Sequence, residues 1–390
     1  MYNGPPTGFD PADIAPRAWR EFDWPVFSLA LDVSGQCNLG CLYCAEAATM
    51  PKARSRMSEE VLDAALACLM SDGQTDVIRT IRLGSGEPLL ALPLLRLLAA
   101  KLRAMGPAAP KVFLTTNGSR LSAGTMHWLV GTEWTVKISL DGPADIHDRW
   151  RPDAKGAPTH AKISAAVGEL ARRIPDRLAV TAVLCRGTDP KRVFEAIAAL
   201  GVRRIEMLPV VTRQSEMLPD RDDVAAYARF VENYCEDWFH DKPQPRLIRL
   251  ADMMLRAMGY NVSQVVCGAA RGYYGVGADG GLYPCVRFIG IEDYRIGHVS
   301  DGIYADAARD FRANAGRPYE ERGACAACWA APLCNGPCFA CSELMGPGDG
   351  SPFALHCDYF RIDAWNAAAL VARMRSTPER LAALLPGVSI

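Results

Sequence analysis

The sequence lacks the features of an exported, membrane-spanning or nucleic-acid-binding protein. It has no charge-free run of about 18 apolar residues, and its first 16 residues lack the cationic and apolar segments of a signal peptide. Lys and Arg (43) nearly balance Asp and Glu (44), so no basic excess indicates nucleic acid or a membrane surface as a partner. We therefore expect a cytoplasmic protein.

Cysteine, in contrast, is abundant and grouped. Of 14 cysteines, only Cys68, Cys185 and Cys235 fall outside two groups. One group is Cys37, Cys41 and Cys44, and the other is Cys267, Cys285, Cys325, Cys328, Cys334, Cys338, Cys341 and Cys357. Cytoplasmic thiols stay reduced, so a disulfide framework is not expected. Grouped cysteines in such a chain predict metal or catalytic sites.

Short apolar segments alternate with amphipathic ones between residues 27 and 210, which predicts an α/β fold. The predicted strands are Phe27–Val33, Thr80–Leu83, Lys111–Thr115, Trp134–Leu140, Leu178–Leu184 and Arg203–Leu208. The predicted helices are Ser58–Met70, Leu89–Met105, Ser122–Val130, His160–Ile174 and Pro190–Leu200. Six such units imply a parallel sheet with right-handed crossovers. Because a closed barrel has eight units, we expect a partial (β/α)6 barrel with its site at the carboxyl ends of the strands.

The C-terminal part has a different composition. Helical patterns cover Arg221–His240 and Arg246–Met258, and Val262–Phe360 is rich in Cys, Gly and Pro. Such a segment cannot bury a large apolar core and needs metals to fold. A last helix is predicted at Ile362–Leu385. The predicted domains are an N-terminal extension (1–26), a barrel (27–220), a helical bridge (221–261), a Cys-rich domain (262–360) and a C-terminal helix (361–390).

The segment Cys37-Asn-Leu-Gly-Cys41-Leu-Tyr-Cys44 directly follows the first predicted strand. Three thiolates can hold three irons of a [4Fe–4S] cluster, which ordinarily takes four cysteines. The fourth iron would then be open to a substrate or cofactor. A zinc site with three Cys and one further ligand is the alternative.

This CxxxCxxC segment, with an aromatic residue before its last Cys, resembles the signature of the radical S-adenosylmethionine (SAM) superfamily. Leu83-Gly-Ser-Gly-Glu-Pro88 resembles that family's GGEP motif, and Thr115-Thr-Asn-Gly118 and Ser139-Leu-Asp-Gly-Pro143 match in order at the next strand ends. Each match alone is weak, because a Gly-rich strand end is often only a turn. The resemblance implies that SAM binds the open iron and is cleaved to a 5′-deoxyadenosyl radical, which abstracts hydrogen.

The same resemblance indicates where SAM would bind. The backbone at Gly84, Ser85, Gly86 and Glu87 could receive the SAM amino group, because glycines permit close approach. Asn117, Ser139 and Asp141 suit the carboxylate side or the ribose hydroxyls. Arg151 is either a bidentate carboxylate partner or an ordinary paired arginine. Tyr43 either stacks near the adenine or the cluster, or is a core aromatic residue.

The C-terminal cysteine spacing is similar to that of the SPASM domain of peptide- and protein-modifying radical SAM enzymes. The resemblance implies two auxiliary [4Fe–4S] clusters, and three clusters in all. Cys325, Cys328, Cys334 and Cys357 would hold one. Cys267, Cys285 and Cys338 would hold the other, with Cys341 as a fourth ligand or with one iron open. A zinc ribbon formed by Cys325, Cys328, Cys334 and Cys338 is the alternative.

We expect hydrogen abstraction from a ribosomally made peptide, giving a cross-link or another oxidative modification. Sulfatase maturases, which the resemblance includes, typically place Asp after the Cys of Tyr-Pro-Cys, whereas this chain has Val286. Only 36 residues precede Cys37, too few for the usual peptide-recognition domain, so a separate recognition protein is a possible partner. A one-electron reductant of the flavodoxin or ferredoxin type is also implied.

Two other functions stay open: a radical SAM dehydrogenase or epimerase acting on a sugar or amino-acid derivative, and a non-enzymatic electron-transfer or zinc protein. The candidates for an acid–base group are Glu46, Glu206, Asp279 and Arg287. Glu206, at a predicted strand end, is the one that we select.

Overall fold

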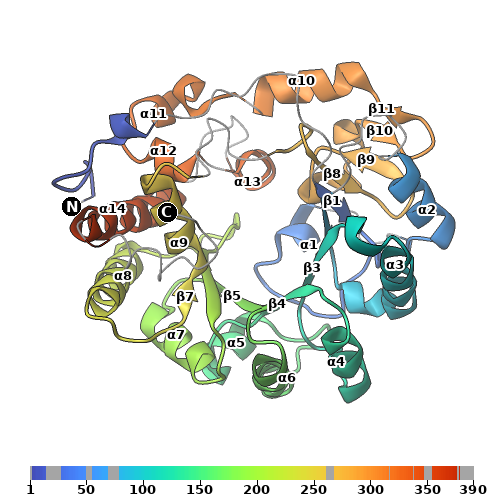
Figure 1. Cartoon of the computed structure of the whole chain (residues 1–390), viewed down its shortest axis with the longest axis horizontal. Coiled ribbons are helices and arrows are strands. Elements are labelled where there is room, and N and C mark those ends of the chain that lie inside the picture. The colour runs from blue at the N-terminus through green and yellow to red at the C-terminus, as the bar shows by residue number, and fades with distance from the viewer. Residues whose placement is uncertain are drawn as a thin grey trace.

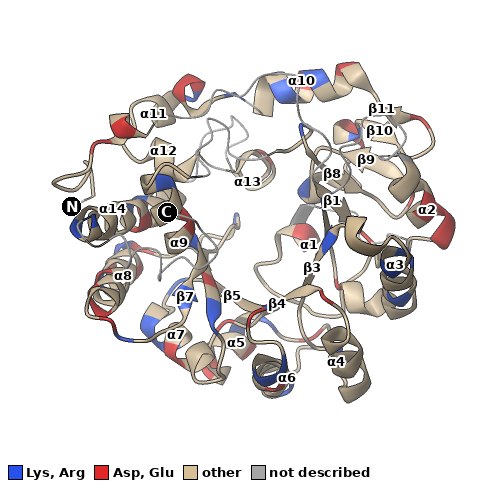
Figure 2. Cartoon of the chain, in the orientation of Figure 1, with Lys and Arg blue, Asp and Glu red and all other residues tan. Residues whose placement is uncertain are grey.

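The computed structural model describes residues 2–14, 28–49, 55–68, 79–260, 268–315, 317–336, 338–346, 354–375 and 377. These residues form a curved sheet of eleven strands, and helices cover its outer side (Figure 1). Charged residues of both signs are interspersed along the outer helices (Figure 2). None of the described helices has the length and apolar character needed to cross a bilayer.

Seven parallel strands follow one another in the sheet in chain order. They are β1 (Ser28–Leu31), β2 (Thr80–Leu83), β3 (Lys111–Thr116), β4 (Thr135–Ser139), β5 (Leu178–Leu184), β6 (Arg204–Pro209) and β7 (Arg246–Leu247). The prediction of an open α/β barrel is confirmed. The first two residues of the helix predicted at Arg246–Met258 instead form β7, because they pair with Arg204 and Ile205 at the edge that β6 would otherwise expose.

Seven of the nine described helices that accompany these strands lie close to predicted positions, whereas the short helices α1 and α5 were not predicted. The nine are α1 (Ala45–Thr49), α2 (Glu59–Cys68), α3 (Leu92–Ala104), α4 (Ala123–Val130), α5 (Ala144–Trp150), α6 (His160–Arg173), α7 (Pro190–Ala198), α8 (Arg221–Phe239) and α9 (Ile248–Ala257). The helix predicted at Leu89–Met105 is divided into a 3-10 turn, Pro88–Ala91, and α3. Proline stands in the first turn of both pieces, a position where its missing N–H is not needed.

The Cys-rich segment extends the same sheet on the other side of β1. Its strands are β8 (Tyr273–Val276), β9 (Gly281–Tyr283), β10 (Gly297–His298) and β11 (Gly302–Ile303). β8 lies parallel to β1, and β9, β10 and β11 follow as an antiparallel series. Short strands of this kind carry little periodicity and gain their partners only through tertiary pairing, which explains why they were not predicted.

The C-terminal helices are α10 (Ala305–Ala315), α11 (Gly323–Ala326), α12 (Ala331–Cys334), α13 (Phe339–Met345) and α14 (Ala354–Met374). The predicted start of the last helix at Ile362 is wrong, because α14 begins at Ala354 and includes Cys357. The predicted boundary at residue 361 therefore falls inside this helix. Its predicted end at Leu385 lies outside the described residues.

Helix α14 lies beside α8 and α9 (Figure 1). A group of buried polar side chains joins these three helices. The Asp363 carboxylate on α14 accepts hydrogen bonds from Tyr227 Oη on α8, at 2.8 Å, and from Arg249 Nε on α9. Arg249 Nη2 also donates to Tyr227 Oη at 2.9 Å, and its guanidinium lies 4.7 Å from the Phe360 ring centre. Asp363 is 1% exposed, so Arg249 depends on it for its counter-charge.

Asp363→Asn should therefore lower the free energy of unfolding by about 3–5 kcal/mol, since it leaves a buried guanidinium without a counter-charge. Urea unfolding of the reconstituted protein measures the change. Glu236→Gln is the matched control, because the Arg373–Glu236 ion pair is 41% and 51% exposed and is expected to contribute at most about 1 kcal/mol. Equal losses in the two variants would contradict this account.

Candidate functional site

The first cysteine group and the three other motif segments meet at the carboxyl edge of the parallel strands. Glu87 joins three of these segments: its backbone N–H donates to Gln36 O at 2.7 Å, and its carboxylate accepts from Thr116 Oγ1 at 2.6 Å and from Asn117 N at 2.7 Å. Asn117 Nδ2 in turn donates to Cys37 Sγ at 3.6 Å. The ends of β1, β2 and β3 are thus tied together beside the cysteines.

The Glu87 side chain is used within the protein rather than presented at the surface. It is completely buried, and burial raises the pKa of its carboxyl group although its hydrogen bonds oppose the shift. What the Gly84–Glu87 segment can offer a ligand is therefore its backbone, as predicted from its glycines.

Gly86 occupies a position that no other residue could take without displacing the loop. Its φ of +58° lies in the left-handed region, and a Cβ there would lie 2.3 Å from the carbonyl oxygen of Gln36. Its N–H donates to Glu46 Oε2 at 2.8 Å. The sequence marked Gly86 by its motif but gave no sign of its contact with Gln36.

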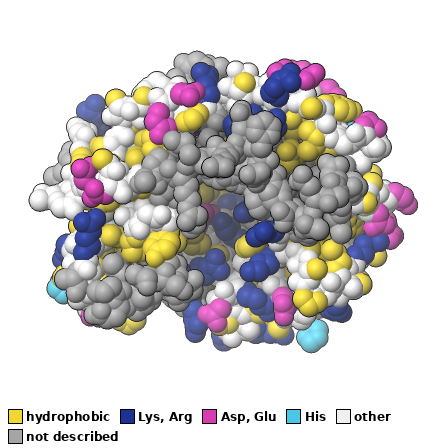
Figure 3. Space-filling view, turned by 45° about the horizontal axis from the view of Figure 1, so that its top comes forward, with side chains coloured by type: hydrophobic (Ala, Val, Ile, Leu, Met, Phe, Trp, Pro, Cys, Tyr) yellow, Lys and Arg dark blue, Asp and Glu magenta, His cyan; other side chains and the backbone are white. Residues whose placement is uncertain are grey.

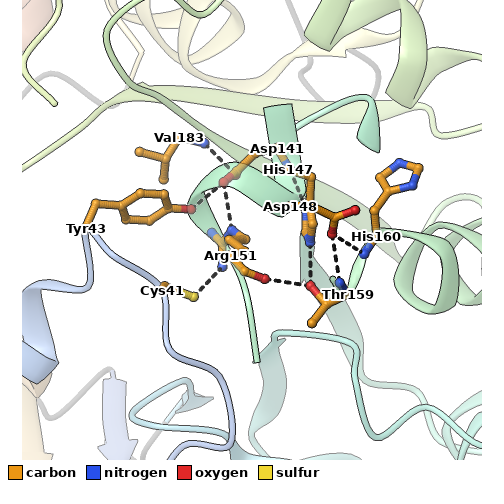
Figure 4. A network of polar contacts seen from close by, with 9 residues as sticks. All are labelled: Cys41, Tyr43, Asp141, His147, Asp148, Arg151, Thr159, His160 and Val183. Carbon is orange, nitrogen blue, oxygen red and sulfur yellow. Dashed lines mark hydrogen bonds and ion pairs between the residues drawn. The ribbon is translucent and has the colours of Figure 1, made fainter. Parts of the chain in front are cut away.

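Asp141, after β4, lies at the centre of a second network (Figure 4). It is completely buried and accepts hydrogen bonds from Tyr43 Oη at 2.5 Å, Arg151 Nε at 2.9 Å and Val183 N at 2.9 Å. Its oxygens therefore already have partners inside the protein. The structure places Asp141 as a support for Tyr43 and Arg151 rather than as a group open to the ribose.

Arg151 connects this network to the cysteine loop. It is 7% exposed, donates from Nη1 to Cys41 Sγ at 3.8 Å, and lies 5.2 Å from the centre of the Tyr43 ring. Burial raises the pKa of Cys41 to about 11, while the Arg151 charge acts in the opposite direction. A guanidinium in this position favours the thiolate form that a metal requires.

His147 fixes the position of Arg151 from behind. Its Nδ1 accepts from Asp141 N at 3.2 Å, so Nε2 carries the proton that faces Thr159 Oγ1 at 3.0 Å. Thr159 Oγ1 then donates to Arg151 O at 2.7 Å. Burial lowers the pKa of His147 to about 4, which indicates a structural role for a neutral imidazole.

Ser139 and Glu206 lie on the inner face of the barrel wall. Ile138 packs on the outer face, against Ile163 of α6 near Gly118, so its neighbours Lys137 and Ser139 face inward. Lys137 Nζ donates to Glu206 Oε2 at 2.8 Å, and the Glu206 side chain keeps 19% of its surface exposed. Figure 3 shows Lys and Arg side chains gathered within a central hollow of the molecule.

In the C-terminal region, four of the cysteines come together. Cys325, Cys328, Cys334 and Cys357 line one pocket between α11, α12 and α14. The pKa of Cys334 is raised to about 12 and that of Cys357 to about 11, mainly by burial and in part by the neighbouring thiols. This set is the one that the sequence assigned to one auxiliary cluster.

A third group forms around Arg287. Cys341, Cys338 and Cys285 all act on the pKa of Arg287, which they raise well above its usual value. Cys338 and Cys341 are also hydrogen-bonded to each other. Cys267, predicted to join this group, lies outside the described residues. Cys341, which the sequence left uncertain, is thus found with Cys285 and Cys338.

The three cysteine groups offer the thiol donors that the predicted clusters need. Three separate groups of thiols with arginines nearby fit the donor set of iron–sulfur clusters.

A large cavity lies away from the motif loops. Its volume is about 1070 Å³, and it lies between α10, α11, α13 and α14, where Cys325 and Cys357 form part of its wall. Of the remaining cysteines, Cys185 and Cys235 are buried and have raised pKa values because of that burial. The Cys68 side chain lies outside the described residues.

Comparison with known proteins agrees with this arrangement. Residues 31–176 match the model of the Radical SAM superfamily. These residues therefore form a radical SAM domain. The chain is 23% identical over 347 residues to the cysteine-type anaerobic sulfatase-maturating enzyme of Clostridium perfringens strain 13, covering 83% of this chain and 92% of that one.

Solved structures show the same fold for the rest of this radical SAM chain. Native anSMEcpe with bound AdoMet and Cp18Cys peptide has a TM-score of 0.72 and 20% identity, over 90% of this chain and 99% of that one. SuiB from Streptococcus suis, bound to its precursor peptide SuiA, has a TM-score of 0.56 and 15% identity, over 81% and 72% of the two chains. The barrel and the Cys-rich C-terminal region therefore have the architecture of SPASM-type maturases.

Gly86→Ala should weaken SAM binding at least about tenfold, because the new Cβ collides with Gln36 O in the loop to which the motif resemblance assigns SAM. Gly106→Ala is the matched control: Gly106 has a similar φ of +63° but has nothing within 4 Å of an added Cβ. The control should lose only about 1–2 kcal/mol of stability through backbone strain. Calorimetric titration of both anaerobically reconstituted variants with SAM measures the difference, and equal affinities would rule out the clash.

His147 should make stability depend on pH. Its pKa is lower in the folded chain, about 4, than in the unfolded chain, about 6.5, so the unfolded state takes up the proton first. Its contribution is complete above about pH 7 and falls by about 2 kcal/mol between pH 7.5 and pH 5. Urea unfolding across this range should show a steeper loss for the wild type than for His147→Gln. Parallel profiles would contradict a neutral, buried His147.

Proposed function

We propose that this chain reductively cleaves SAM and abstracts hydrogen from a residue of a peptide or protein substrate. The observation that carries the proposal is the convergence of Cys37, Cys41 and Cys44 with Gly86 and Asn117 at one edge of the barrel. The architecture supports a chain substrate, because it is shared with anSMEcpe bound to the Cp18Cys peptide and with SuiB bound to SuiA.

Three cysteine sets would hold three [4Fe–4S] clusters: Cys37, Cys41 and Cys44 with SAM on the open iron; Cys267, Cys285, Cys338 and Cys341; and Cys325, Cys328, Cys334 and Cys357. When bound, the clusters supply the electron that cleaves SAM and accept the electron that an oxidised substrate releases. An external reductant of the flavodoxin or ferredoxin type would supply the first electron.

The residues of the chain hold SAM and exclude water around it. The backbone of Gly84, Ser85 and Gly86 would receive the SAM amino group, and Asn117 and Ser139 would bind its other polar groups. Asp141 would hold Arg151 and Tyr43 in place beside Cys41, as their hydrogen bonds indicate. Because Asp141 itself has no open side, it would act on SAM through these two residues.

Oxidation of a substrate side chain by two electrons also releases a proton. We assign its acceptance to Glu206, which faces the inside of the barrel beside Lys137. Loss of one hydrogen atom to the 5′-deoxyadenosyl radical, of one electron to a cluster and of one proton to Glu206 balances the reaction. The product would be a cross-link or another oxidised residue, and a separate recognition protein would present the peptide.

The test is anaerobic incubation of the enzyme with SAM, a reductant and short peptides encoded beside its gene, followed by mass spectrometry. A peptide that loses two hydrogens while 5′-deoxyadenosine accumulates is the expected result. SAM cleavage with every peptide unchanged, even with neighbouring recognition proteins added, would instead favour a small-molecule substrate. Without any SAM cleavage, the proposal fails.

Replacing Cys37, Cys41 and Cys44 together by Ala should remove all SAM cleavage and about a third of an expected total of about twelve irons per chain. Cys185→Ala is the matched control, because Cys185 is buried outside the three groups and acts as a small apolar residue. It should keep all its iron and its cleavage activity. Retained cleavage in the triple variant would contradict the assignment of the SAM cluster.

A further inference from the structure

Arg287 has anionic or potentially anionic groups among its neighbours. It lies two residues after Cys285, in the 3-10 turn Val286–Phe288, and it lines a small cavity with Cys341. The thiols of Cys341, Cys338 and Cys285 raise its pKa. Cys285, Cys338 and Cys341 were assigned above to one of the two auxiliary clusters, and we call them the second auxiliary group. Arg287 is therefore not an isolated surface charge but part of the surroundings of that group.

Glu46 is a further neighbour of Arg287. Both residues line a small cavity between α1 and α13, together with Cys341 and Met345. The Glu46 carboxylate adds to the raised pKa of Arg287. The same carboxylate accepts the N–H of Gly86 at 2.8 Å. One guanidinium thus shares a cavity with an auxiliary cysteine and with a carboxylate that holds the SAM-binding loop.

A fixed positive charge at this place has a definite electrostatic effect. A guanidinium keeps its proton at any working pH, so Arg287 cannot serve as the acid–base group for which it was a sequence candidate. Beside thiolate ligands it favours the more negative, reduced state of whatever redox centre they hold. Its surroundings, which include Ala340, Leu344 and Met345, are apolar and screen this effect little.

We propose that Arg287 is a positioning residue that sets the reduction potential of the cluster held by Cys285, Cys338 and Cys341 and couples this cluster, through Glu46, to the SAM-binding loop at Gly86. The proposal rests on the function proposed above, since it requires a cluster at these cysteines. Each auxiliary group then has a different arginine, Arg287 at Cys285, Cys338 and Cys341 and Arg361 at Cys328 and Cys357.

Redox titration monitored by electron paramagnetic resonance tests this proposal. In Arg287→Gln the midpoint potential of one auxiliary signal should become more negative, while that of the SAM cluster stays unchanged. Arg287→Lys, which keeps the charge, should restore most of the shift. Glu46→Gln should instead weaken SAM binding severalfold, because Gly86 loses a charged hydrogen-bond acceptor.

Arg361→Gln is the matched control. Arg361 faces Cys328 and Cys357 of the other auxiliary group, so its removal should shift only the other signal, and by less, because Arg361 is 33% exposed. If the Arg287→Gln variant loses the cluster, Arg287→Lys should keep the cluster and its wild-type midpoint potential. Loss of the cluster in both variants would overturn the electrostatic role. An unchanged midpoint in Arg287→Gln overturns the inference alone. A wild-type protein without auxiliary signals overturns the proposed function as well.

Discussion

The site depends on one buried carboxylate. Asp141 has no contact with water, and a charge in that position is tolerated only when donors surround it. Its donors come from three segments: Tyr43 in the cysteine loop, Arg151 after α5 and the backbone of Val183 in β5. Satisfying Asp141 therefore fixes how the cysteine loop sits on the barrel. Because Arg151 also reaches Cys41 Sγ, the same constraint determines the charge beside the first thiol.

The motif glycines are required by packing within the protein as much as by a ligand. The Cβ of a residue at position 142 would lie 2.8 Å from Val193 Cα, just as one at position 86 would collide with Gln36 O. Both glycines end strand-to-helix segments that carry polar groups toward the cysteine loop. The glycines of these motifs thus have a physical explanation. At positions 86 and 142 the loops can approach their neighbours only because the residue has no side chain.

Much of this arrangement could be predicted from the sequence, and the rest required tertiary contacts. β2 and β5 lie where their apolar segments predicted them, because their side chains are buried by neighbouring elements. The strands β7 to β11 have two to four residues each, too few for a periodic signal. Cysteine spacing indicated which thiols would meet. Glu46 and Arg287, in contrast, are far apart in the chain, and no local sequence pattern indicates that they line the same cavity.

In the proposed oxidation, the charges around the barrel mouth would separate the transfer of an electron from the transfer of a proton. The turn after Cys285 carries Val286 and Arg287, an apolar and a cationic residue, so neither can accept a proton there. A cation beside thiols instead makes it easier for that centre to take up an electron. Glu206, which Lys137 holds on the inner wall, is the carboxylate to which we assign acceptance of the proton. Electron and proton would then leave a substrate in different directions, one toward the Cys-rich region and the other into the barrel.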